Sequence, residues 1–241
     1  MMTINDRSYS FENFLTDDSN LFAFKASIAV AENPVYYINP LLIYGEHGCG
    51  KTHLLYAIED KIRTEHPGKT IVFTTAEEIV SLWIPVLKSK AYTDSLEVLC
   101  ELYRGADVLL IDNFEDVAGK SATTDLMMKF IARRSAEYLQ TVMVSSDSIL
   151  SRRYIIDEFK VRFEDGVLAK VEMAGRGLKK RFVSLVAEDL GVKLDGYIVK
   201  YLSRLDDTPP AELRGIVQKI LLYWQINHAP PAIYWLERNI K

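Results

Sequence analysis

Pro40 to Leu55 read Pro-Leu-Leu-Ile-Tyr-Gly-Glu-His-Gly-Cys-Gly-Lys-Thr-His-Leu-Leu, an apolar run followed by a glycine-rich turn and a helical pattern. Four of these residues match the phosphate-binding loop pattern G-x-x-x-x-G-K-[ST], namely Gly45, Gly50, Lys51 and Thr52. Such a loop connects a buried strand to the first turn of a helix, and the same order is found here. The stretch therefore predicts a nucleotide-binding α/β fold.

The residue types in this loop suit the chemistry of phosphate binding. Glycines let main-chain N–H groups turn toward a ligand, because no Cβ blocks the approach. The N-terminus of the following helix adds partial positive charge. We expect Lys51 to reach the β- and γ-phosphates of ATP or ADP, and the Thr52 hydroxyl to ligate Mg²⁺.

Composition excludes several other classes of protein. The chain has 241 residues, of which 49% are hydrophobic, so it can form a substantial core. Its net charge of −4 does not favour general nucleic-acid binding, and any DNA contact needs a local basic patch. No apolar run approaches the roughly 20 residues of a membrane helix. Two cysteines and four scattered histidines indicate neither a disulfide framework nor a metal cluster. We expect a cytoplasmic protein.

Strand-like and helix-like segments alternate along the first 173 residues. Continuous apolar runs predict five buried strands, at 41–44, 70–74, 106–111, 141–145 and 167–172. Helical patterns lie between them, at 21–32, 51–64, in two pieces within 76–104, and at 122–138. This alternation predicts a doubly wound parallel sheet with helices on both faces.

The pattern changes at Ala174-Gly-Arg-Gly177, after which only helices are expected. The expected helices lie at 178–190, after a cap at Asp195, and from Pro210 onward with a strongly amphipathic stripe. We therefore predict two domains: an α/β nucleotide-binding domain at 1–173 and a small all-helical lid at 174–241.

A second nucleotide motif follows the third predicted strand. Val108-Leu-Leu-Ile-Asp112 is an apolar strand that ends in an acid, the Walker B pattern, and Asp112 is expected to hold Mg²⁺. The next residue, Asn113, can orient a water molecule but cannot accept its proton. Because general-base catalysis is worth ~10²–10⁴-fold, hydrolysis is expected to be slow unless another group substitutes. Glu115 and Asp116 lie nearby, and a turn would direct them elsewhere.

Longer motifs resemble the AAA+ domain of the bacterial replication initiator DnaA. They are Tyr9-Ser-Phe-Glu-Asn-Phe14, Asn39-Pro-Leu-Leu-Ile-Tyr-Gly45, Gly48-Cys-Gly-Lys-Thr-His-Leu-Leu55, Asp107-Val-Leu-Leu-Ile-Asp112, Ala118-Gly-Lys120, Ser145-Ser-Asp147 and Lys160-Val-Arg-Phe163. The resemblance covers essentially all of 8–225. It implies an AAA+ ATPase with a five-stranded parallel sheet and a helical lid, binding ATP or ADP with Mg²⁺ at their junction.

The resemblance also implies roles for individual residues. Phe14 and Asn20 belong to an N-terminal segment that packs against adenine. The nucleotide-binding loop extends through Gly48, Cys49 and His53, the last being more structural than catalytic. Asp147 falls at the sensor I position near the γ-phosphate. Arg162 falls at the arginine-finger position, which acts on nucleotide held by a neighbouring subunit.

Four departures from the family pattern accompany these matches. Asn113 occupies a position where a second Asp is usual. Ala211 occupies the position of the sensor II arginine, and Arg214 follows one turn later. Ala122 replaces a basic residue implicated in single-stranded DNA contact. The helix-turn-helix domain for duplex DNA has no counterpart in the chain, as expected of an excised domain or a stand-alone relative. The regulatory relative Hda shares Ile-Asp-Asn at Walker B, but its clamp-binding peptide has no match in residues 1–14.

Three functions remain open at this point. The first is a nucleotide switch in replication initiation, assembling on a DnaA-type neighbour through Arg162 with slow or absent hydrolysis. The second is an active ATPase of the initiator or helicase-loader type acting on single-stranded DNA, and the third is a non-catalytic interaction module. Basic residues could contact DNA or a partner but are more simply solvated surface; they are Arg133, Arg134, Arg152, Arg153, Lys179, Lys180 and Arg181.

Overall fold

The computed structural model describes residues 9–34, 38–88, 95–117, 121–146, 157, 159 and 166–240. The elements in chain order are α1 (Leu21–Glu32), β1 (Leu41–Gly45), α2 (Lys51–Glu65), β2 (Ile71–Thr75), α3 (Ala76–Lys88), α4 (Ser95–Leu102), β3 (Val108–Asp112), the 3₁₀ turn η1 (Phe114–Val117), α5 (Ser121–Ala136), β4 (Gln140–Ser146), β5 (Val167–Val171), α7 (Arg176–Asp189), α8 (Gly196–Leu202), α9 (Pro210–Asn227) and α10 (Ile233–Asn239). The predicted strands and helices are confirmed to within two residues at their bounds, and α10 is an additional helix.

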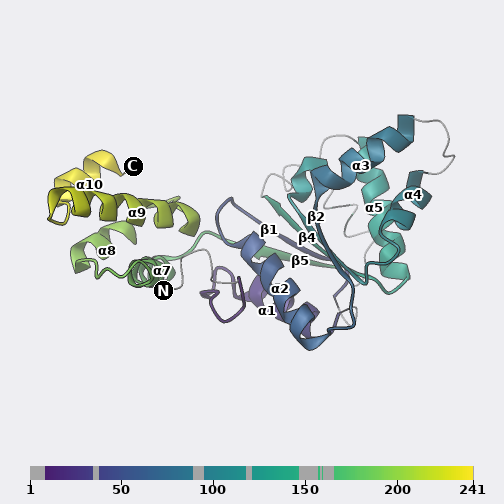
Figure 1. Ribbon diagram of the computed structural model, residues 1–241, viewed down its shortest axis with the longest axis horizontal. Helices are drawn as coiled ribbons and strands as arrows, with labels where there is room; N and C mark the ends of the chain where they lie inside the picture. The colour runs from purple at the N-terminus through teal and green to yellow at the C-terminus, as the bar shows by residue number, and fades with distance from the viewer. Residues whose placement is uncertain are drawn as a thin grey trace.

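The strands form one parallel sheet in the order β2-β3-β4-β1-β5. Because side chains alternate between the two faces of a strand, Leu41 and Ile43 pack with α1 and α2, whereas Leu42 packs with α3, α4 and α5. Helices on both faces bury the sheet, and Figure 1 shows this layering. The predicted doubly wound α/β architecture is therefore confirmed, and its carboxyl edge is where such folds bind ligands.

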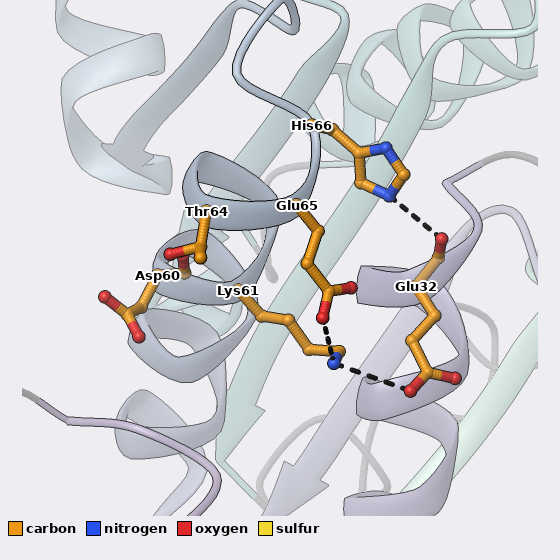
Figure 2. Close-up of polar contacts among 6 residues, drawn as sticks. All are labelled: Glu32, Asp60, Lys61, Thr64, Glu65 and His66. Carbon is orange, nitrogen blue, oxygen red and sulfur yellow. Dashed lines mark hydrogen bonds and ion pairs between the residues drawn. The ribbon is translucent and has the colours of Figure 1, made fainter.

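Polar side chains join the ends of α1 and α2 (Figure 2). The Nε2–H of His66 donates to the main-chain carbonyl of Glu32, at 2.9 Å. Lys61 Nζ lies 2.7 Å from a Glu65 carboxylate oxygen and 3.5 Å from one of Glu32. These contacts are partly exposed and worth under about 1 kcal/mol each. Their effect is to keep α1 aligned with α2, the helix that begins at the phosphate loop.

Helices α7 to α10 gather to one side of the sheet-containing part (Figure 1). They share a hydrophobic cluster of their own, which includes Val183 of α7, Ile198 of α8, Leu213 of α9 and Leu236 of α10. The expectation of an all-helical C-terminal region is confirmed, while the proposed boundary after residue 173 stays a prediction. Within the described ranges, no helix combines the length and the apolar character needed to cross a membrane.

Candidate functional site: the phosphate loop and the strand ends beside it

The loop between β1 and α2 has the backbone shape of a phosphate-binding turn. Gly50 has φ +100° and is followed directly by the helix that opens at Lys51. A side chain at Gly50 would be strained by this φ and would begin 3.0 Å from the Phe14 ring. The loop therefore requires glycine here, as the motif predicts. Cys49, the residue before it, is buried.

The ammonium of Lys51 is held inside the loop. Its Nζ donates to the carbonyls of Gly45 (2.8 Å) and Glu46 (2.7 Å), and the residue is 7% exposed. A buried ammonium is stable only with such partners. The side chain therefore directs its charge into the loop, where the motif expects phosphate oxygens.

The two nucleotide motifs meet at Thr52 and Asp112. The Thr52 Oγ1–H donates to Asp112 Oδ2 at 3.0 Å, joining the first turn of α2 to the end of β3. Asp112 Oδ1 also accepts the main-chain N–H of Asn113, at 2.8 Å. A hydroxyl and a carboxylate oxygen are the hard ligands that Mg²⁺ prefers, with waters and substrate phosphates completing its shell. The residues present therefore fit a Mg²⁺–nucleotide site.

Asn113 turns the chain away from the sheet. Its φ of +52° is a left-handed conformation, which Asn adopts more easily than most residues, and its side chain is exposed. The expected turn is present as η1, and it directs Glu115 toward the end of β4. There the Glu115 Oε2 accepts the main-chain N–H of Ser146 at 2.9 Å. Burial raises the pKa of Glu115, but hydrogen bonds from its own amide and from Ser146 outweigh this and leave the pKa lowered.

The N-terminal segment covers the loop with aromatic side chains. The Phe14 ring stacks on Phe24 at 5.7 Å and meets the edge of His53 at 5.1 Å. The Nε2–H of His53 donates to the Ser10 carbonyl at 2.9 Å, and burial lowers the pKa of His53. His53 thus holds the N-terminal segment against α2, which agrees with a structural role.

Asn20 shapes the same segment from within. Its side-chain amide donates to the Leu15 carbonyl at 3.0 Å, and its side-chain oxygen accepts the Asp17 N–H at 3.0 Å. The residue is 5% exposed. These contacts fold the loop before α1, so Asn20 acts on the position of Phe14, and direct contact with a nucleotide stays a prediction.

The C-terminal helices reach the loop through the first turn of α9. The Ala211 N–H donates to the Gly48 carbonyl at 3.3 Å. Gly48 has φ +76°, and a Cβ on it would lie 3.0 Å from that of Ala211 and 3.2 Å from Pro209. This contact between distant parts of the chain has no signal in the sequence.

Comparison with known proteins identifies the family. The family model described as the bacterial DnaA ATPase domain matches residues 5–170. The chain belongs to the DnaA ATPase-domain family. The chromosomal replication initiator protein DnaA of Aliarcobacter butzleri is 32% identical over 218 residues, covering 90% of this chain and 48% of that protein. The chain therefore spans about half the length of the curated DnaA relatives it matches.

Solved DnaA structures share the fold. Domain III of DnaA from Thermotoga maritima superposes with a TM-score of 0.78 at 25% identity, covering 95% of this chain and 94% of that one. AMPPCP-bound DnaA from Aquifex aeolicus superposes with a TM-score of 0.73 at 24% identity, covering 91% and 67%. The AAA+ architecture with a parallel sheet and a C-terminal helical region is thus confirmed.

Several family positions of DnaA can now be located. Ala211, at the expected sensor II position, packs on the phosphate loop, and Arg214 lies one turn further along α9. Asp147, Arg162 and Lys120 lie outside the described residues, so the sensor I and arginine-finger assignments stay predictions.

Two of the basic residues expected at the surface are instead buried, so that interpretation is wrong for them. Arg134 is 2% exposed and donates to the carbonyls of Ala106 (2.9 Å) and Gln140 (3.2 Å). Lys179 is 4% exposed and donates to the Leu205 carbonyl. Both bind main-chain carbonyls that need donors, which is why burial is tolerated. Neither can contact DNA. Arg152 and Arg153 lie outside the described residues.

Of the remaining basic residues that the structure describes, Lys180 and Arg181 are exposed and Arg133 is partly exposed. Arg133 pairs with Glu97 and with Glu137, both on exposed surface. Arg181 of α7 donates to the Thr16 carbonyl at 3.2 Å, a link between the C-terminal helices and the N-terminal segment.

Proposed function

We propose that this chain is a DnaA-type nucleotide switch that acts in the initiation of DNA replication or its regulation. It binds ATP or ADP with Mg²⁺, hydrolyses ATP slowly, and uses the bound nucleotide to control assembly with a neighbouring DnaA-type subunit. The observation that carries the proposal is the 3.0 Å hydrogen bond between Thr52 and Asp112, which brings the two nucleotide motifs to one point.

The described residues supply the groups that a nucleotide needs. The Lys51 ammonium and the loop amides would hold the phosphates, and Thr52 and Asp112 would hold Mg²⁺. The aromatic segment around Phe14 would face the base. AMPPCP is bound to the DnaA of Aquifex aeolicus, which shares the fold of this chain. The bound ion would add charge stabilisation for the phosphate oxygens.

Slow hydrolysis follows from the acids beside the loop. Asn113 cannot accept a proton from water. Glu115, two residues later, accepts the Ser146 amide and has a lowered pKa, which makes it a weak base. Neither residue is therefore suited to general-base catalysis.

Assembly with a neighbour is the further part of the proposal. Arg162 would act on nucleotide bound by the adjacent subunit, and residues 174–241 would act as a lid that changes angle with the nucleotide. A DnaA replication initiator with the same fold is bound to both AMPPCP and single-stranded DNA. Single-stranded DNA is therefore a candidate partner here, and the cytoplasm is the expected location.

The experiment that tests the proposal compares Thr52→Val with Thr52→Ser. Valine has nearly the shape of threonine but lacks the hydroxyl, whereas serine keeps it. We expect Thr52→Val to lose about tenfold in affinity for ATP in Mg²⁺ but not in EDTA, since 1.4 kcal/mol corresponds to tenfold. Thr52→Ser should retain the Mg²⁺ effect. Equal Mg²⁺ dependence in all three proteins, measured with a fluorescent nucleotide, would contradict the proposed site.

A further inference from the structure

Glu115 lies where the chain leaves β3 and passes the end of β4. The turn η1 that carries it is anchored by two fully buried side chains, Phe114 and Val117. With its neighbours fixed in the core, Glu115 is directed at Ser146 instead of at solvent. Asp116, the next residue, is exposed and forms the natural comparison.

The strand pairing explains why a carboxylate is found there. The ladder between β3 and β4 runs from Val108 opposite Gln140 to Ile111 opposite Met143 and then ends, because Asn113 turns the chain away. On its other side β4 continues to pair with β1 as far as Ser146, which lies opposite Gly45. The last three residues of β4, 144–146, thus have a strand neighbour on one side only.

Glu115 supplies the acceptor that β3 no longer provides. Its Oε2 accepts the Ser146 N–H at 2.9 Å, so the end of β4 is held on both sides. The lowered pKa of Glu115 agrees with an ionised group bound to amides. Ser146 pairs with Gly45, the first glycine of the phosphate loop, and the Gly45 carbonyl binds the Lys51 ammonium. The contact of Glu115 with Ser146 is therefore connected to the loop through Gly45.

We propose that Glu115 is a positioning residue that fixes the end of β4 against the first glycine of the phosphate loop. This role rests on the proposed nucleotide function. The ends of β1 and β4 would flank the terminal phosphate, and Glu115 would fix the spacing between them. Glu115 acts through a hydrogen bond and not as a proton acceptor. An uncharged acceptor of the same length should therefore replace it.

Two variants separate these roles. Glu115→Gln keeps a side-chain oxygen that can accept the Ser146 N–H, whereas Glu115→Ala removes it, and Asp116→Asn is the matched control. The first measurement is hydrogen exchange of the Ser146 amide in nucleotide-free protein. We expect exchange about 10- to 100-fold faster in Glu115→Ala, the range for a hydrogen bond to a charged group, and near wild-type exchange in Glu115→Gln and Asp116→Asn.

The second measurement is steady-state ATP turnover beside nucleotide affinity. We expect Glu115→Ala to lower kcat about tenfold with affinity unchanged within about twofold, and Glu115→Gln to retain kcat. Unchanged exchange of the Ser146 amide in Glu115→Ala would overturn the proposal. So would loss of turnover in Glu115→Gln with the amide still protected, which would make the carboxylate a base. If the wild type binds no nucleotide, the proposed function fails, while the amide exchange still decides whether Glu115 holds β4.

Discussion

The main-chain N–H of Ala211 donates a 3.3 Å hydrogen bond to the carbonyl of Gly48, which joins the first turn of α9 to the phosphate loop. Ala211 and Pro209 also pack against the bare Cα of Gly48. A loop that shifts to accept phosphate must therefore move against α9. Through this contact a bound nucleotide could affect the C-terminal helices.

An arginine at residue 211 should bring a positive charge from α9 to the bound phosphates. We predict that Ala211→Arg binds ATP about tenfold more tightly than wild type, with a smaller gain for ADP, because a guanidinium at the start of α9 would face the loop. Ala211→Leu is the control for added bulk without charge. Isothermal titration with each nucleotide measures the effect. Equal weakening of both nucleotides in Ala211→Arg and Ala211→Leu would show that only packing matters there.

A carboxylate at residue 113 should restore a proton acceptor. We predict that Asn113→Asp raises steady-state ATP turnover by about 100-fold, the lower end of the ~10²–10⁴-fold range for general-base catalysis. Asn113→Ala should give no increase. Phosphate release under saturating Mg·ATP is the measurement, and unchanged turnover in Asn113→Asp would contradict the account of slow hydrolysis.

The core of the site could be predicted because its signals are local. The loop motif lies within eight residues, and the strand that ends at Asp112 must place its acid at the carboxyl edge of a parallel sheet, beside the loop. The helix start at Thr75 was equally predictable: Thr75 Oγ1 accepts the Glu78 N–H at 3.2 Å and Glu78 accepts the Thr75 N–H at 2.9 Å, a complete capping box.

The remaining contacts join distant parts of the chain and carry no local signal. Ser10 meets His53 across 43 residues, and Glu115 meets Ser146 across 31. The burial of Arg134 has a similar cause. The carbonyls that Arg134 satisfies lack other donors because of the way β3 and β4 begin side by side. The sequence around Arg134 carries no pattern that predicts this.

His53 should titrate below an ordinary histidine. Burial lowers its pKa, so the folded state binds fewer protons than the unfolded state between the two pKa values, and stability rises with pH in that window. We predict that the free energy of unfolding falls as pH drops below about 6.5, the unperturbed value. His53→Gln should lose this dependence. NMR titration of the ring should give a pKa below that of the unperturbed residue, and a value at or above 6.5 would contradict the burial argument.

Arg134 should contribute strongly to stability. Burial lowers its pKa to about 10, and its guanidinium satisfies buried carbonyls at the start of β4 and before β3. We predict that Arg134→Met lowers the free energy of unfolding by about 3 kcal/mol, since each buried carbonyl left without a donor costs roughly 1–3 kcal/mol. Arg133→Ala, which removes exposed ion pairs at the adjacent residue, should cost under about 1 kcal/mol. Urea unfolding measures both, and equal effects would contradict the assignment.

The central claim is that the loop around Lys51 binds an adenine nucleotide, and titration calorimetry with millimolar Mg·ATP or Mg·ADP tests it most directly. The account predicts saturable uptake of one nucleotide by the wild type and none by Lys51→Ala, with both proteins folded by circular dichroism. Folded wild-type protein that shows no uptake, or Lys51→Ala that binds as tightly as the wild type, would contradict it.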